Sequence, residues 1–357
     1  MQNPLFSVIV PVYNAQDYIA RALESLTQQS FKQIEIICVD DCGSDNSASV
    51  LSEFAAKDAR VKIVKNPHNL GLFETRRQGA AAAKGDYLLF CDADDYFDKE
   101  ICQRCFEILS HAGAFDANGG GKVDFVKFSI LLQKPDGEFE PFSQVKQNAV
   151  LSVSEFEARY FGQEVFWSLC DKCVNKQTYL QANKLLSITQ KVTQSEDMLA
   201  FAAILSVSEK CALLGGANYY YCLNPNSVTR VFDKQILERS ESDLRFVLGR
   251  VEQLAHTHYA THKNERHKLF LQALALNLQQ HIARLQAKLS PANLAYQQLL
   301  ATYHARLAHG FNRHLARWIL SWQKLPIKGK LKQDNRAVKE SEARLKAFVE
   351  ENKAAFK

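Results

Sequence analysis

The sequence predicts an α/β protein with a parallel sheet covered by helices on both faces, a second α+β half beside it, and a helical C-terminal region. Strand-like and helix-like segments alternate up to Asp95, as they do in parallel sheets. The alternation stops before the glycine run at 119–121. From residue 233, glycine and proline become rare and apolar residues recur at helical spacing. We therefore expect three parts, at residues 1–112, 113–232 and 233–357.

The first part alternates short apolar runs with amphipathic segments. The expected strands are Phe6–Val10, which Pro11 ends, Ile34–Val39, Val61–Val64 and Tyr87–Cys91. The expected helices are Asp17–Gln29, one capped by Ser44 or Asp45, and one from Gly71 to about Lys84. This order of elements is typical of βαβ units, in which each helix crosses back over the sheet.

The second and third parts follow other patterns. Val123–Leu132 and Phe139–Phe142 flank KPDGE, a turn sequence that predicts a hairpin. Leu199–Leu205 is typical of a helix and Tyr219–Leu223 of a strand. In the third part, apolar residues at helical spacing continue to residue 285 and predict long helices.

Composition and charge exclude several classes of protein. The 357 residues are 46% hydrophobic and 23% charged, and the net charge of +5 is too small to indicate nucleic-acid binding. No apolar run approaches the ~18 residues of a membrane span. The N-terminal sequence is not typical of a signal peptide. The nine cysteines are an odd and scattered set, which indicates reduced thiols in a cytoplasmic protein.

Cysteine pairs and a histidine-rich stretch are the other candidates for metal binding. The C-x-x-C pairs at 102–105 and 170–173 lie too far apart in the chain for the usual zinc spacing. The first pair instead suits one face of a helix. His258 and His262 could face one way on a helix, but no carboxylate pattern accompanies them. We expect a solvated helical face there.

The segment GDYLLFCDADD, residues 85–95, is the strongest candidate for a functional site. Its apolar run ends in Asp92, Asp94 and Asp95. Alternate residues of an extended chain face the same way, so Asp92 and Asp94 can converge while Asp95 points elsewhere. Two converging carboxylates favour a hard divalent cation, Mn²⁺ or Mg²⁺, which could hold a diphosphate. The alternative is a solvated turn at a strand end.

Several short motifs strengthen the functional interpretation: PVYN at 11–14, VDD at 39–41, NLG at 69–71, Arg76 with Gly79, DAD at 92–94 and ED at 196–197. In this order they resemble the family 2 glycosyltransferases of the GT-A fold, in which a Rossmann-like nucleotide-binding half is fused to an acceptor-binding half. The resemblance spans about residues 5–232. VDDCGSDNS, NLGL, FWSLCDKCVNKQTYL and SEDML look closest to bacterial lipooligosaccharide β-1,3-galactosyltransferases.

The resemblance implies a uridine site in the first part of the chain. Pro11, Tyr13 and Asn14 would lie against the uridine, although Tyr13 could equally be a packing aromatic. Asp41 would accept a hydrogen bond from uracil N3–H, because a carboxylate only accepts; the alternative is an ordinary turn residue. Asn69 would support the same loop.

The resemblance also implies the diphosphate site and the catalytic groups. Asp94 would bind the metal, with Asp92 beside it contacting ribose or sugar hydroxyls. Arg76 would bind the diphosphate or a carboxylate of the DAD motif. Asp197 would be the general base, with Glu196 as the second candidate, unless the two acids merely cap a helix. One direct displacement would invert the anomeric centre, so an α-linked donor would give a β-glycoside.

We therefore expect an inverting enzyme that transfers galactose from a UDP-sugar to a glycan or glycolipid acceptor of lipooligosaccharide or a related surface polysaccharide. Alternatives are a UDP-GlcNAc or UDP-GalNAc transferase of the same fold, and a non-catalytic carbohydrate-binding GT-A protein. A dehalogenase-type phosphatase would carry its DxD nearer the N-terminus. A nicotinamide enzyme would show GxGxxG after the first strand.

Two further segments carry predictions about the acceptor. Trp167 and Lys172, in WSLCDK, would line the acceptor pocket, with core packing as the alternative for Trp167. Phe311–Gln333 contains six basic residues and no acidic one, with tryptophan and leucine between them. This mixture suits an anionic headgroup boundary and predicts a peripheral protein at the inner face of the bacterial inner membrane. The alternative is that these tryptophans pack the helical region onto the catalytic domain. The sequence does not predict an oligomeric state.

Overall fold

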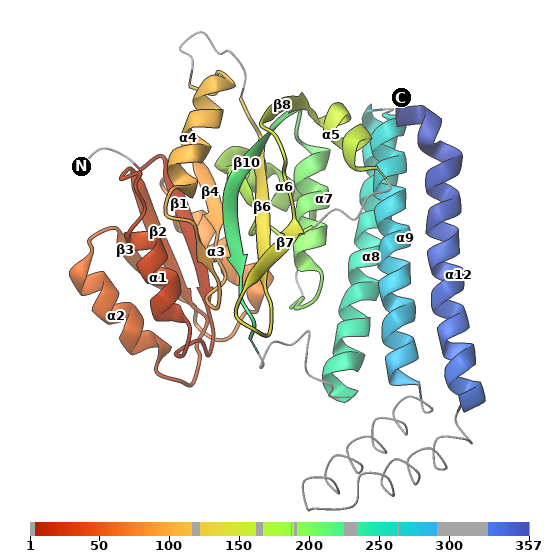
Figure 1. Ribbon diagram of the computed structural model, residues 1–357, viewed down its shortest axis with the longest axis horizontal. Coiled ribbons are helices and arrows are strands. Elements are labelled where there is room, and N and C mark those ends of the chain that lie inside the picture. The colour runs from red at the N-terminus through yellow and green to blue at the C-terminus, as the bar shows by residue number, and fades with distance from the viewer. Residues whose placement is uncertain are drawn as a thin grey trace, which may run out of the picture.

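The protein has one continuous mixed sheet with helices on both faces and a row of long helices at one end (Figure 1). This arrangement confirms the expected α/β fold. The computed structural model describes residues 4–115, 122–161, 167–186, 188, 191–224, 234–262, 264–290 and 328–356.

The first part of the chain forms the parallel half of the sheet. Its strands are β1 (Phe6–Val12), β2 (Ile34–Asp40), β3 (Val61–Lys65) and β4 (Tyr87–Phe90). Its helices are α1 (Ile19–Thr27), α2 (Ser47–Lys57) and α3 (Leu72–Ala82). The strand β1 pairs in parallel with β2 and β4, and β2 pairs with β3, so their carboxyl ends meet at one edge. Every residue of β1 and β2 is buried, as expected for strands covered on both faces.

Two expectations about element ends are corrected by the structure. Pro11 does not end the first strand but lies inside β1, opposite Val39. The pairing of β1 with β4 stops at Ile9, so on that side the proline has no neighbouring strand that would need an N–H donor. The helix α2 begins at Ser47, with Asn46 in the N-cap position and no side-chain capping hydrogen bond, so neither Ser44 nor Asp45 is its cap. Asp45 Oδ1 does accept a hydrogen bond from the Ser47 backbone N–H at 3.0 Å.

The segment from residue 91 to 232, which includes the end of the first part, continues the same sheet. Its elements are β5 (Tyr96–Phe97), α4 (Ile101–His111), β6 (Phe125–Gln133), β7 (Phe139–Ser143), β8 (Ala149–Ser152), α5 (Val153–Tyr160), β9 (Lys172–Asn175), α6 (Lys176–Leu186), α7 (Glu196–Ser206) and β10 (Lys210–Tyr221). The strands β6 and β7 form the predicted hairpin. Because β9 is antiparallel to both β4 and β6, it joins the two halves. The strand order is β3-β2-β1-β4-β9-β6-β10-β5, with β7 beside β6 and β8 beside β10.

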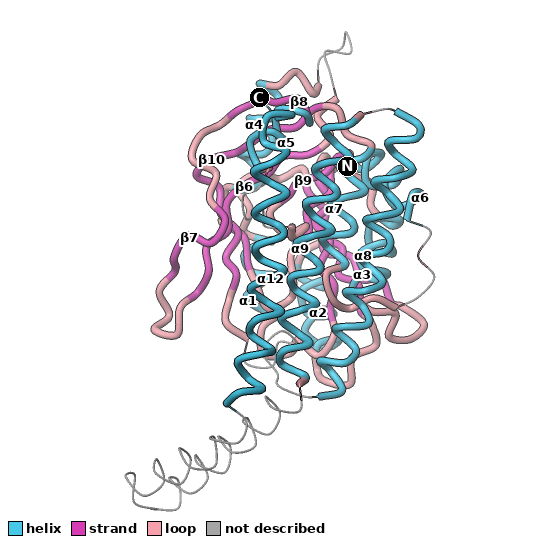
Figure 2. Tube along the Cα trace, turned by 90° about the vertical axis from the view of Figure 1, so that its right-hand side faces the viewer, coloured by secondary structure: helices cyan, strands magenta, loops and turns pink. Residues whose placement is uncertain are grey.

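The third part forms the row of long helices. They are α8 (Lys234–His262), α9 (Glu265–Leu289) and α12 (Lys328–Asn352), and a 3₁₀ turn (Lys353–Phe356) follows. Figure 2 shows them stacked beside α7, and α9 contacts both α8 and α12. Apolar residues of α8 and α9 share one buried cluster with the sheet. Among the described helices, none combines the length and the apolar character needed to cross a bilayer. Residues 311–327 of the proposed membrane segment lie outside the described residues.

Candidate active site

A cleft of about 1290 Å³ lies between the carboxyl ends of β1, β2 and β4 and the helices α7, α8 and α9. Open α/β sheets bind their ligands at this edge. The residues predicted for nucleotide, metal and catalysis all line this cleft: Pro11, Tyr13, Asn14, Asp41, Asn69, Arg76, Asp92, Asp94, Glu196 and Asp197.

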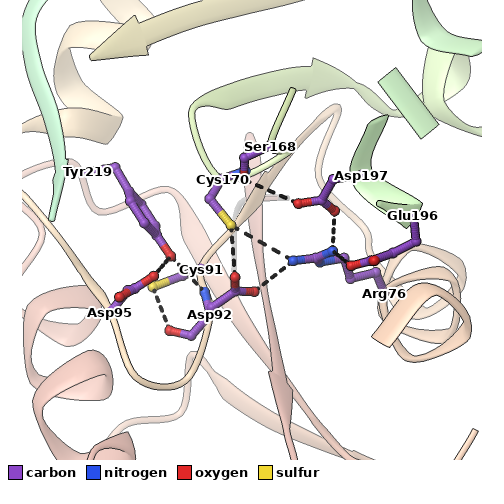
Figure 3. A network of polar contacts seen from close by, with 9 residues as sticks. All are labelled: Arg76, Cys91, Asp92, Asp95, Ser168, Cys170, Glu196, Asp197 and Tyr219. Carbon is purple, nitrogen blue, oxygen red and sulfur yellow. Dashed lines mark hydrogen bonds and ion pairs between the residues drawn. The ribbon is translucent and has the colours of Figure 1, made fainter. Parts of the chain in front are cut away.

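The guanidinium of Arg76 joins the two acidic motifs at the centre of this cleft (Figure 3). Its Nη2 donates to Asp92 Oδ1 at 2.8 Å, and its Nη1 contacts Glu196 Oε1 at 3.2 Å and Asp197 Oδ1. The side chain is only 1% exposed. Burial by itself would lower the pKa of Arg76, but the charges of Asp197 and Asp92 raise it well above its usual value. The sequence analysis predicts either a diphosphate or a carboxylate of the DAD motif as the partner of Arg76. The structure shows Arg76 paired with a carboxylate of that motif, Asp92.

A glycine on α3 allows this arginine to reach the site. A Cβ at Gly79 would lie 2.5 Å from Cγ2 of Ile9 and 3.1 Å from Cγ2 of Val39, so only glycine lets α3 approach the sheet this closely. Arg76 lies one turn earlier on the same helix and is fully buried. The pairing of Arg76 with Gly79 in the sequence thus has a packing reason.

The acids of the ED motif begin α7 but do not act as a side-chain cap. The residue before them, Ser195, has a left-handed backbone with φ +59° and makes no capping hydrogen bond. Asp197 Oδ2 instead accepts a hydrogen bond from Ser168 Oγ at 3.2 Å. Burial raises the pKa of Asp197, while Arg76 opposes that rise. Burial and the neighbouring charge of Asp197 raise the pKa of Glu196 to about 8.

The three carboxylates of the DADD segment have different partners. Asp92 Oδ2 accepts a hydrogen bond from the Cys170 thiol at 3.3 Å. Asp94 Oδ2 accepts a hydrogen bond from the Asn224 amide at 2.8 Å. Burial and the charge of Asp92 raise the pKa of Asp94, because a negative charge nearby disfavours a second one.

Asp95 is the third carboxylate, and it points away from the cleft. It accepts hydrogen bonds from the Tyr219 hydroxyl at 2.5 Å and from the backbone N–H of Cys222 at 2.7 Å. The Tyr219 oxygen in turn accepts from the backbone N–H of Asp92 at 3.2 Å. Asp95 therefore fixes the turn that presents the other two carboxylates.

These carboxylates suit a divalent cation that also binds a phosphate group. Asp92 and Asp94 are oxygen donors at one end of the cleft, and their mutual repulsion is what a cation would relieve. Within the described residues there is no group of three or more histidine, cysteine, aspartate or glutamate side chains arranged to hold a metal. Two protein carboxylates completed by phosphate oxygens are a common arrangement for Mg²⁺. The donor set therefore fits the predicted Mn²⁺ or Mg²⁺.

The loops at the ends of β1 and β2 hold the remaining predicted residues. Tyr13 is 52% exposed and is not a packing aromatic. Asn14 Oδ1 accepts a hydrogen bond from Ser44 N at 2.8 Å, which ties the first loop to the second. Lys191 Nζ donates to Asn69 Oδ1 from the opposite wall of the cleft.

Asp41 has a structural role that the sequence analysis missed. Its Oδ1 accepts from Asn66 Nδ2 and from Leu70 N, both at 2.7 Å, and its Oδ2 accepts from Gly71 N at 3.0 Å. It is 3% exposed but still lines the cleft. Since Oδ2 accepts a single hydrogen bond from these groups, it has capacity for another donor.

Of the two residues predicted for the acceptor pocket, only one lies in the cleft. Trp167 lines it and also packs against Phe201 and Phe270, with ring centroids 6.0 and 5.8 Å away. The prediction for Lys172 is wrong, because its side chain is fully buried and forms an ion pair with Asp171. Four residues near the acids were not predicted as site residues: Ser168, Cys170, Tyr219 and Asn224.

The cysteine and histidine expectations have mixed outcomes. Cys102 and Cys105 are buried on one face of α4, as expected. The prediction that the histidines lie on a solvated helical face is wrong for His258. Its ring packs against the rings of His262 and His267, with centroids 4.3 Å apart in both pairs. Burial and the two neighbouring rings lower the pKa of His258 to about 4.

Comparison with known proteins identifies the family of the N-terminal region. Residues 7–145 match the family described as Glycosyl transferase family 2. The chain is 29% identical over 231 residues to the uncharacterized glycosyltransferase EpsJ of Bacillus subtilis, covering 64% of this chain and 64% of EpsJ. The chain thus spans less than two thirds of the length of that relative.

Solved structures of the same fold cover nearly the whole chain. The crystal structure of Staphylococcus aureus TarS 1–349 in complex with UDP-GlcNAc has a TM-score of 0.56 at 20% identity, covering 92% of this chain and 91% of that one. The mannosyltransferase PcManGT of Pyrobaculum calidifontis, in complex with GDP-Man and Mn²⁺, has a TM-score of 0.50 at 15% identity, covering 97% and 88%.

None of these three proteins is named as a lipooligosaccharide galactosyltransferase, so that finer resemblance stays a prediction. The coarser resemblance rests on the family match over residues 7–145 and on a fold shared with two solved glycosyltransferases. The chain therefore has a GT-A-like fold, and its residues 7–145 match glycosyltransferase family 2.

Proposed function

We propose that this protein transfers a sugar from a UDP-sugar to a glycan acceptor, with inversion at the anomeric carbon and with the help of a divalent cation. The observation that carries the proposal is the Arg76 network, which brings a DAD motif and an ED motif from distant parts of the chain to one cleft. A pair of carboxylates for a phosphate-binding cation and a general base are then adjacent, as a sugar transfer from a diphosphate requires.

In this proposal Asp197 is the general base. Its side chain is 21% exposed at the cleft, whereas that of Glu196 is 8% exposed. With a pKa of about 8, Glu196 is mostly protonated at neutral pH and cannot accept a proton there. Burial raises the pKa of Asp197, which makes it a stronger base, while Arg76 keeps it ionised.

The reaction is one displacement at C1 of the donor sugar. The acceptor hydroxyl gives its proton to Asp197 while its oxygen forms a bond to C1. The bond from C1 to the diphosphate oxygen breaks on the opposite face, and its electron pair leaves with UDP. Asp94, together with Asp92, would hold the cation, which when bound supplies charge stabilisation to the departing diphosphate. Arg76 fixes the distance between the base and the DAD motif.

The donor loops and the acceptor wall lie on different parts of the chain. We assign nucleotide binding to residues 1–112 and acceptor binding to residues 113–232. Residues 233–357 form a further wall of the cleft. The cleft residues of α8 and α9 that contribute to this wall include Arg239, His281 and Arg284. Galactose in β-1,3 linkage is the proposed transfer, to lipooligosaccharide or a related surface polysaccharide, with N-acetylglucosamine and N-acetylgalactosamine as the other candidates.

A donor screen tests the function. The purified protein is incubated with Mn²⁺ and, separately, UDP-Gal, UDP-GlcNAc, UDP-GalNAc, UDP-Glc or GDP-Man, and nucleotide diphosphate release is measured with and without mixed glycan acceptors. We expect release from one UDP-sugar above the others, and release slower by ~10²-fold or more with Asp197→Asn. Release from GDP-Man alone would contradict the uridine site, and no release from any donor would contradict a transferase.

We further propose that Phe311–Gln333 brings the protein to an anionic membrane surface where a lipid-linked acceptor is presented. The support is the six basic residues with interleaved tryptophan and leucine. Flotation with anionic vesicles at low salt tests this. A full-length protein that ignores the vesicles, or a truncation after Asn312 that binds them equally well, would contradict it.

A further inference from the structure

A buried lysine lies directly behind the proposed general base. Lys172 is fully buried, and its Nζ donates to the carbonyl oxygen of Ser168 at 2.5 Å. Its ammonium also lies 4.1 Å from the ring centroid of Phe201, a residue of α7, the helix that begins with the ED motif. Lys172 therefore contacts both segments that position Asp197.

The Ser168–Lys172 loop holds Asp197 through short contacts. The Ser168 hydroxyl accepts from the backbone N–H of Cys170 at 3.0 Å and donates to Asp197 Oδ2 at 3.2 Å. The backbone N–H of Leu169 also donates to Asp197. The backbone N–H of Lys172 closes the loop by donating to the Leu169 carbonyl at 3.0 Å. Asp197 is thus held by this loop on one side and by Arg76 on the other.

A second buried lysine provides an internal comparison. Asp171 is fully buried and pairs with both Lys172 and Lys127. Apart from Asp171, Lys127 donates to the Ser143 hydroxyl on β7 at 2.9 Å, and not to the Ser168 loop. The two lysines therefore share one carboxylate and one degree of burial but differ in what else they hold.

From this difference we infer that Lys172 is a positioning residue for the proposed reaction, acting on the base Asp197 through the Ser168 loop. The inference rests on the proposed function. It also explains why a lysine is buried here at all, because the ion pair with Lys127 would by itself neutralise Asp171. Removing the Lys172 ammonium frees the Ser168 carbonyl and loosens the loop that orients the base. Displacement of a catalytic group by about 1 Å can cost ~10²-fold in rate.

The test compares Lys172→Met with Lys127→Met as a matched control. Turnover of the preferred UDP-sugar is measured as kcat and donor KM, together with the melting temperature. Each change removes one ammonium from Asp171 and leaves the other, so the loss of thermal stability should be similar. We expect Lys172→Met to lower kcat by ~10–10²-fold with donor KM within about twofold, and Lys127→Met to keep kcat within about threefold.

A second variant covers the case in which Lys172→Met does not fold. Ser168→Ala removes the hydroxyl that donates to Asp197 from a position that is only partly buried. It should give a similar loss of kcat with an unchanged melting temperature. The double variant of Lys172 and Ser168 should lose no more than about the larger single effect, because both act through one contact.

The outcomes separate the inference from the proposed function. A wild type that turns over a UDP-sugar, with Lys172→Met and Lys127→Met equally active, overturns the positioning role and leaves the transferase intact. A Ser168→Ala variant with unchanged kcat does the same. A wild type that releases UDP from no donor overturns the function, and the role of Lys172 with it.

Discussion

Two buried ionic clusters contact the same loop, Ser168–Lys172, and have opposite compositions. In the open cluster, Arg76 is the one cation of the described residues that pairs with Asp92, Glu196 and Asp197. The side chains of Asp92 and Asp197 are 27% and 21% exposed at the cleft. In the sealed cluster, Asp171 is the one carboxylate, within the part of the chain that the structure describes, that pairs with Lys127 and Lys172. None of these three side chains exceeds 2% exposure. One cluster has excess negative charge beside solvent and the other has excess positive charge away from it.

The difference shows which cluster is built to receive a ligand. A buried excess of charge is costly, and both clusters show it in their pKa values. Burial and Asp197 raise the pKa of Glu196 to about 8, and burial lowers that of Lys172 to about 8. The open cluster, however, can also be neutralised by a cation that enters the cleft. The sealed cluster can only support what lies next to it.

The largest effect is expected from removing the cation of the open cluster. Arg76→Met leaves three carboxylates facing one another, so turnover should fall by ~10³-fold or more, as after loss of a preorganised electrostatic group. The free energy of unfolding should fall by ~3–5 kcal/mol, as when a buried ion pair loses one partner. Kinetics and urea denaturation measure the two quantities.

The neighbouring arginine on α3 is a matched control for this change. Arg77 pairs only with Glu74 among its charged neighbours in the described structure, 2.8 Å away and three residues earlier on the same helix. Arg77→Met should cost less than ~1 kcal/mol and leave turnover nearly unchanged. Similar losses for Arg76→Met and Arg77→Met would contradict a special role for the open cluster.

The next effect separates the two acids of the ED motif. Asp197→Asn keeps the shape but cannot accept the proton, so kcat should fall by ~10²–10⁴-fold while UDP binding is kept. Glu196→Gln resembles the protonated side chain already present at neutral pH and should cost far less. If Glu196→Gln loses kcat while Asp197→Asn keeps it, the base is Glu196.

A smaller effect concerns stability and pH. The raised pKa of Glu196 means that the folded protein binds this proton more tightly than the unfolded chain does, so stability is lost as pH rises from about 4.5 to about 8. Glu196→Gln removes this loss, and its melting temperature should exceed that of the wild type by about 2–4 °C or more at pH 8 but not at pH 5.

An exposed glutamate on α4 provides the control for this pH effect. Glu107→Gln should give no gain in melting temperature that depends on pH. A Glu196→Gln variant whose melting temperature follows the wild type at both pH values would show that the glutamate is ionised in the folded protein.

The sequence was most informative where local patterns decide the structure. The strands before Asp41 and Asp92 are short apolar runs, and their carboxyl ends had to meet once the sheet was parallel. The prediction that Pro11 ends the first strand was wrong, because the effect of a proline depends on whether a neighbouring strand needs its N–H. The pairing with β4 has already stopped at Ile9, and this depends on tertiary structure that the local sequence does not show. The ordered motifs located the cleft residues but not what each one contacts.

The missed residues share a physical cause. Tyr219 and Asp95 are joined by a hydrogen bond across a sequence separation of 124 residues, and Asn224 reaches Asp94 across 130. Contacts over such separations cannot be predicted from the periodicity or the motif spacing of the sequence. The aliphatic stem and single charge of Lys172 likewise suit both a pocket wall and a buried ion pair, and only the packing of β9 under α7 decides between them.

The most direct test of the account is calorimetric titration of UDP into the protein with Mn²⁺ and with EDTA. If the open cluster is a site for a cation that carries a diphosphate, Mn²⁺ should tighten UDP binding by ~10-fold or more, which is ~1.4 kcal/mol. Asp94→Ala should abolish that difference without lowering the melting temperature. Equal affinity for UDP in Mn²⁺ and in EDTA would contradict the account.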